Sequence, residues 1–145
     1  MKLMIVELAE GAPQLGREGL WVRHLVDNVY VLDNIPFYAY GIACNDEVYA
    51  EPVGSDLVFK GIRGRKGHSV YRVAFDMENL DSPNDINEFL ENIKNFGCSF
   101  EGCDGRLFAI DVPLGVDVHS LYKYFQNGED KGLWEFEEGH YGTRS

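Results

Sequence analysis

The sequence predicts an α+β protein in which a small N-terminal antiparallel β-barrel or curled sheet packs on a ferredoxin-like βαββαβ sheet. Three observations support this fold class. Only strand-type segments occur between residues 19 and 63, helical and strand-type segments alternate after residue 68, and a basic, glycine-containing stretch separates the two regions. A chain of 145 residues can form one ordinary domain or two very small units packed together.

The N-terminal region has the pattern of consecutive strands. Residues 1–11 form a short apolar run broken by Glu7 and are expected to be the first strand. Four further segments are rich in β-branched and aromatic residues and are separated by Asp, Asn, Gly and Ser: 20–26, 28–32, 47–53 and 56–62. Strand-forming runs between turn-forming residues are typical of a small antiparallel sheet.

Two segments interrupt this pattern. Pro36 cannot donate a hydrogen bond to a central ladder, so residues 34–41 are expected to cross between layers and to place their aromatic side chains in the barrel or the seam. Residues 60–67, KGIRGRKG, have glycine at every third position, which disfavours a helix and indicates a linker or hairpin loop. The expected units are therefore residues 1–67 and 68–145.

The second unit is expected to have the element order strand, helix, strand, strand, helix, strand. Apolar residues at helical spacing predict helices over 85–96 and 116–127, with Gly97 and Asn127-Gly128 as their ends. The expected strands cover 68–77, 98–102, 106–113 and 133–138. Right-handed crossovers in this order place both helices on one face of a four-stranded antiparallel sheet.

The last strand separates aromatic from acidic side chains. Strand residues alternate between faces, so Trp134 and Phe136 point to one face and Glu135 and Glu137 to the other. If the aromatic residues pack under the helices, both carboxylates lie on the open face. The same alternation places Arg72, Asp76 and Asp111 on that open face.

Charge is distributed unevenly along the chain. The net charge is −11, and the residues up to Phe75 contribute little to it, with nine acidic and eight basic side chains. Fifteen acidic and only five basic side chains follow Phe75. Such a field repels nucleic acid and steers a basic protein toward the acidic half.

No group of residues has the composition and spacing of a known catalytic or metal site. The four histidines are scattered, and the three cysteines lack paired spacing. We therefore expect no metal, no cofactor, no disulfide and no enzymatic activity. Sparse cysteines fit a reducing compartment, and the N-terminal apolar run is too short and too charged for a signal peptide or membrane span. The expected location is the cytoplasm, away from membranes.

The chain resembles an uncharacterised bacterial family known only as a domain of unknown function. The resemblance lies in Gly19-Leu-Trp-Val and in the run from Asp33 to Ala50, with its Asn-Ile-Pro-Phe core and its Asp-Glu-Val. That family has no established catalytic residues, so the resemblance implies no site. In size and charge the chain is also similar to the immunity proteins of contact-dependent toxins.

Two functional hypotheses lead from these observations. The first is an acidic binding module that neutralises a basic toxin nuclease domain, with these candidate contacts: Glu129, Asp130, Glu135, Glu137 and Glu138, and Tyr124 or Tyr141 as anchors. The alternative is a small-molecule-sensing regulatory domain whose pocket between the two units is lined by Phe37, Tyr38 and Tyr40. An enzyme that uses His24 or His119 with a carboxylate ranks last, because no motif supports it.

Overall fold

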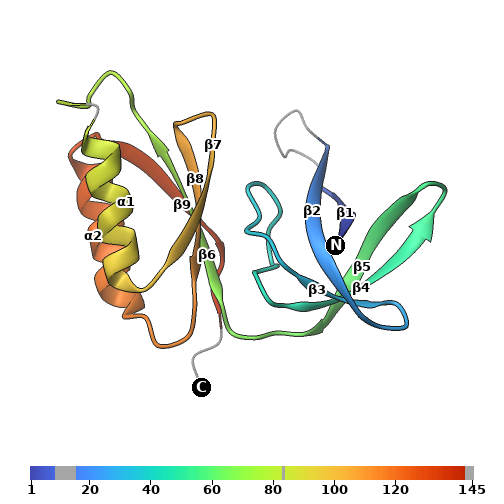
Figure 1. Cartoon of the computed structure of the whole chain (residues 1–145). Coiled ribbons are helices and arrows are strands. Elements are labelled where there is room, and N and C mark those ends of the chain that lie inside the picture. Colours follow the sequence, from blue (N-terminus) through green and yellow to red (C-terminus); the bar gives the residue numbers. More distant parts are fainter. Residues whose placement is uncertain (9–15, 83, 143–145) are drawn as a thin grey trace.

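The computed structural model describes residues 1–8, 16–82 and 84–142, which form two units side by side (Figure 1). The first unit is a closed barrel of five strands: β1 (Lys2–Glu7), β2 (Arg17–Val26), β3 (Val29–Leu32), β4 (Glu47–Val53) and β5 (Asp56–Gly64). The second unit has four strands and two helices: β6 (Ser69–Phe75), α1 (Asn84–Phe96), β7 (Ser99–Cys103), β8 (Leu107–Val112), α2 (Val118–Asp130) and β9 (Trp134–His140). The α+β class with a five-stranded curled sheet is confirmed.

The barrel strands pair in sequence order, and each successive pair is antiparallel. The closing pair, β1 with β5, is parallel and departs from a purely antiparallel arrangement. This follows from the odd number of strands, because the first and fifth strands of an up-and-down barrel run in the same direction. Met4, Leu20, Val22 and Val48 fill the interior.

The second unit is a fully antiparallel sheet in the order β7-β8-β6-β9. Both helices cover one face of this sheet, and the barrel lies on the other side (Figure 1). The core under the helices is aromatic, and the Phe75 ring meets those of Phe89, Phe108 and Trp134 edge to face. As expected, Trp134 and Phe136 belong to this core.

The second helix extends past its expected end at Asn127-Gly128. α2 continues to Asp130, and Gly128 is a buried residue inside the helix at a close packing contact. A Cβ atom there would lie 1.9 Å from Cζ2 of Trp134, and the Trp134 indole N–H donates to the carbonyl of Phe125 at 2.8 Å. Gly128 thus lets β9 return closely across the helix.

The expected linker over residues 60–67 is shorter in the structure, because β5 runs to Gly64. Two register shifts between β4 and β5 accommodate the glycines, and Lys60 is left without a partner opposite Tyr49 and Ala50. A bulge of this kind keeps a glycine-containing segment within a strand. Only residues 65–68 therefore connect the barrel to the sheet.

The face of the sheet opposite the helices was expected to be open to solvent, and this prediction is wrong for the centre of the sheet. Residues between β3 and β4 cover that face, where Ile35 and Ala43 pack on Val70 and Ala109. As a result, Arg72 and Asp111, expected to be exposed, are only 2% and 6% exposed.

None of the helices within the described ranges has both the length and the apolar character to cross a membrane.

Candidate functional site: a groove at the seam

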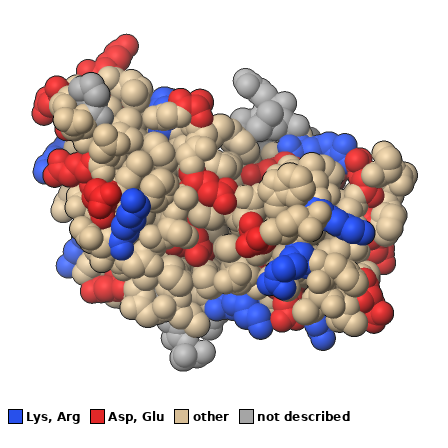
Figure 2. All heavy atoms as spheres, in the orientation of Figure 1, with Lys and Arg blue, Asp and Glu red and all other residues tan. Residues whose placement is uncertain are grey.

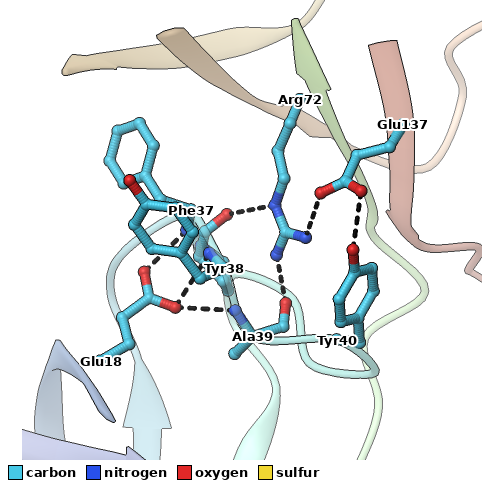
Figure 3. A network of polar contacts seen from close by, with 8 residues as sticks. Glu18, Phe37, Tyr38, Ala39, Tyr40, Arg72 and Glu137 are labelled. Carbon is cyan, nitrogen blue, oxygen red and sulfur yellow. Dashed lines mark hydrogen bonds and ion pairs between the residues drawn. The ribbon is translucent and has the colours of Figure 1, made fainter. Parts of the chain in front are cut away.

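Glu18 holds the segment that covers the sheet. It projects from β2 and accepts hydrogen bonds from three consecutive backbone N–H groups: Phe37 at 2.7 Å, Tyr38 at 3.1 Å and Ala39 at 2.8 Å. Residues 36–40 lie between Glu18 on the barrel side and Arg72 on the sheet side (Figure 3). A buried carboxylate is tolerated here because several donors surround it.

Arg72 holds the same segment from the opposite side. Its Nε donates to the carbonyl of Pro36 at 3.2 Å, and its Nη2 donates to the carbonyl of Ala39. The third bond, from Nη1 to Glu137 Oε1 at 3.1 Å, pairs the buried cation with a carboxylate of β9. Glu18 thus binds backbone N–H groups, and Arg72 binds backbone carbonyl groups, of the same segment, residues 36–39. These bonds hold the aromatic residues of the segment in place.

Tyr40 completes this network. Its ring lies over the guanidinium of Arg72, 4.9 Å from Cζ, and its hydroxyl donates to Glu137 Oε2 at 2.7 Å (Figure 3). The bond to Glu137 and partial burial raise the pKa of the Tyr40 hydroxyl, so the hydroxyl stays protonated and keeps donating at neutral pH. Glu137 is therefore satisfied twice, by Arg72 and by Tyr40.

A cleft of about 350 Å³ opens beside this network. We call it the seam cleft, and its lining comes from the covering segment, from β6 and from β8 and β9: Phe37, Tyr38, Tyr40, Arg72, Ala74, Leu107, Glu135, Phe136 and Glu137. The structure thus places the three aromatic residues of the alternative hypothesis, Phe37, Tyr38 and Tyr40, in one cavity wall. The Glu135 side chain is exposed, and its carboxylate forms no hydrogen bond or ion pair with described residues.

A second hollow, of about 780 Å³, continues from the seam cleft. The two share Ala74, Glu135 and Phe136 in their linings, and together we call them the acidic groove. The larger hollow is lined by four acidic residues and one basic residue: Asp76, Glu78, Glu129, Glu135 and Arg106. Glu135 stands where the two parts meet.

The candidate binding residues do not all gather at this groove. Glu129 and Glu135 line the larger hollow, and Glu135 and Glu137 line the seam cleft. Asp130 lines neither part; it is the last residue of α2 and accepts a hydrogen bond from Gln126 at 3.0 Å. The other candidates lie elsewhere. Glu138 accepts from the Tyr71 hydroxyl at 3.0 Å, Tyr124 accepts from Asn92 at 3.1 Å between the helices, and Tyr141 is exposed beyond β9.

Sequence reasoning missed Glu18 and the role of Arg72. A signal for Glu18 exists, because it shares the inward-facing parity of Leu20 and Val22 on β2, where an apolar residue would be expected. For Arg72, the signal is the almost continuous apolar run on either side of it, Val70-Tyr-Arg-Val-Ala-Phe, which is typical of a strand buried on both faces. Charged side chains at such positions require buried partners.

A second polar cluster lies near the connection between the units. His68 Nδ1 contacts Asp111 at 2.8 Å, and Arg65 contacts Asp46 at 3.5 Å. Burial, reinforced by the charge of Asp111, raises the pKa of the Cys44 thiol to about 11, which leaves it protonated and a poor nucleophile at neutral pH. Among the described residues, no group of three or more His, Cys, Asp or Glu is arranged to hold a metal ion.

The two units and their seam define a barrel-and-sheet α+β protein with a known structural counterpart. This counterpart is described as a novel crystal structure of a hypothetical protein from Neisseria gonorrhoeae. The two structures have a TM-score of 0.83 and 18% sequence identity over 98% of this chain and 96% of that chain. At this identity, the likeness extends to the fold alone. No curated protein shows significant similarity to the chain.

The chain belongs to the family described as domain of unknown function DUF4265, whose model matches residues 18–136. The expectation of an uncharacterised domain family is therefore confirmed. The matched region begins at Glu18 and includes Arg72 and Glu135.

Proposed function

We propose that the protein is a binding module for a basic protein partner, which docks over the acidic groove. The partner class that fits best is a basic toxin nuclease domain, and neutralising it would make this chain an immunity protein. Electrostatic complementarity of this kind accelerates association and selects the partner, while a few desolvated contacts supply affinity. Neither an enzymatic step nor a cofactor enters this proposal.

Uncompensated charge on the second unit carries the proposal. Fifteen carboxylates follow Phe75, and within the described ranges only Glu91, Asp111 and Glu137 have an ion-pair partner. On the barrel, by contrast, four carboxylates are paired with Arg or Lys: Glu7, Asp46, Glu47 and Asp56. Figure 2 shows Asp and Glu on both halves, with much of the Lys and Arg over the barrel half.

The test measures association of the partner captured from the native host at low salt. Glu78 and Glu135 are exposed and line the groove, so the pair E78K and E135K should slow association about tenfold or more. The matched control, E51K with E88K, makes the same change in net charge at exposed positions outside the groove.

Three outcomes would contradict the proposal. One is an equal effect of the groove variant and the control, and another is a wild-type rate that does not fall as salt is added, because exposed charges are screened beyond about 8 Å at physiological ionic strength. Capture of only neutral or acidic proteins is the third. Stopped-flow fluorescence supplies the rates.

A second candidate function is a small-molecule-sensing domain, favoured by the aromatic lining of the seam cleft. Its volume of about 350 Å³ falls in the lower part of the range for small-ligand sites, about 300–1,000 Å³. Saturation of the cleft by a metabolite, without any protein partner, would favour this candidate.

We also assign the second unit to the ferredoxin-like arrangement and the protein to the cytoplasm. The strand order β7-β8-β6-β9 and the two helices on one face support the first assignment. The sparse cysteines of the chain, Cys44, Cys98 and Cys103, are consistent with the second.

A further inference from the structure

We infer that the seam cleft is an arginine-binding subsite, which takes one guanidinium side chain presented by the partner. The inference rests on the proposed function, since it names the chemical group that anchors a basic protein in the acidic groove. It is carried by three features of the cleft: its one unpaired charge, its aromatic walls and its preformed shape.

The charge in the cleft favours a cation. Arg72 and Glu137 neutralise each other through their bond of 3.1 Å, and the Tyr40 ring covers the Arg72 guanidinium. An anion therefore finds no free positive charge among the described residues that line the cleft. Glu135, by contrast, is exposed and has no partner among the described residues, so it leaves the cleft with a net charge of about −1.

The walls favour a long, flat cation. Phe37 and Tyr38 are half-buried, with ring centroids 6.5 Å apart, and Leu107 contributes further apolar surface. The planar guanidinium of arginine stacks on aromatic rings and donates two hydrogen bonds to one carboxylate, whereas the lysine ammonium is a compact, strongly hydrated charge. An arginine stem can therefore lie along the rings while its head reaches Glu135.

The cleft is already shaped before binding. Glu18 and Arg72 together make five hydrogen bonds to the backbone of residues 36–39, which holds the aromatic residues in position. Binding to a preorganised site avoids the cost of ordering a loop. These five hydrogen bonds explain why a segment without regular secondary structure can form one side of a binding site.

The test uses the acetylated tripeptide amide Gly-Arg-Gly and its lysine and citrulline counterparts, titrated into isotope-labelled protein by NMR. Citrulline has the shape of arginine without its charge. We expect millimolar binding of the arginine peptide, about threefold weaker binding of the lysine peptide and at least about tenfold weaker binding of the citrulline peptide. The shifted amides should be those of Phe37, Tyr38 and Glu135.

Two variants localise the site. E135Q removes the free charge and Y38A removes one aromatic wall while leaving the backbone bond to Glu18, and each should weaken the arginine peptide about fivefold or more. E51Q, on the barrel, should change nothing. Equal binding of citrulline, shifts outside the cleft, or no binding below about 10 mM would overturn the inference.

These outcomes are distinct from failure of the proposed function. If the tripeptide does not bind but E78K with E135K still slows association of the protein partner, the groove binds its partner without an arginine subsite. If the tripeptide binds and the charge reversals have no effect on association, the subsite serves another ligand and the proposed function fails.

Discussion

Replacing Glu18 with alanine should destabilise the protein by about 3–5 kcal/mol. The substitution removes the acceptor of three N–H bonds, 2.7, 3.1 and 2.8 Å long. Bonds to a charged group contribute about 1.5–3 kcal/mol each, so the upper bound is about 4.5–9 kcal/mol. Phe37 and Tyr38 are half-buried, so water can replace part of the lost carboxylate there and reduces the expected loss of stability below that bound. Ala39 is only 3% exposed, so its N–H would stay unsatisfied.

Replacing Glu18 with glutamine separates the contribution of the hydrogen bonds to Oε1 from that of the hydrogen bond to Oε2. Oε1 accepts from Tyr38 and Ala39, and Oε2 accepts from Phe37. An amide oxygen in the place of Oε1 keeps the two hydrogen bonds from Tyr38 and Ala39, while the amide nitrogen, itself a donor, faces the Phe37 N–H and cannot accept from it. E18Q should therefore cost about 1–3 kcal/mol, less than E18A.

Urea unfolding measures both effects. Trp21 lies on the barrel and Trp134 on the sheet, so single-tryptophan variants report each unit separately. The exposed side chain of Glu51 has no hydrogen bond to described residues, and E51A should change the free energy of unfolding by less than about 0.5 kcal/mol. A loss below about 1 kcal/mol for E18A would refute the view that this carboxylate holds the covering segment.

Two further perturbations test the packing and the seam. Helix propensity alone predicts that G128A stabilises the protein by up to about 1 kcal/mol. The added Cβ would lie 1.9 Å from Trp134, so we expect the substitution to destabilise the protein instead, by roughly 1–3 kcal/mol. A raised melting temperature would contradict this. Burial and Arg65 lower the pKa of His140, so the folded state binds fewer protons and stability is lost as pH falls through the folded pKa, below about 6.5. H140Q should therefore flatten the loss of stability between about pH 7 and 5, and the exposed control H119Q should not; equal pH profiles for H140Q and wild type would argue against it.

Local periodicity was enough to predict the elements and their faces. The helix expected over 85–96 is found at Asn84–Phe96, because amphipathic spacing and a glycine end are properties of neighbouring residues. The separation of Trp134 from Glu135 on β9 follows in the same way from the two-residue period of a strand. Charge asymmetry, which is independent of conformation, could also be read directly.

Only the tertiary structure decided what covers the second face of the sheet. Alternation places Arg72 and Asp111 opposite the helices, but it carries no information on whether water or another unit lies there. The covering segment lies between Leu32 and Glu47 and meets Glu18 and Arg72 across wide sequence separations. Such contacts depend on how the barrel docks on the sheet, and no local pattern encodes that geometry. For the same reason Gly128 resembles a helix end in the sequence and is a packing contact in the fold.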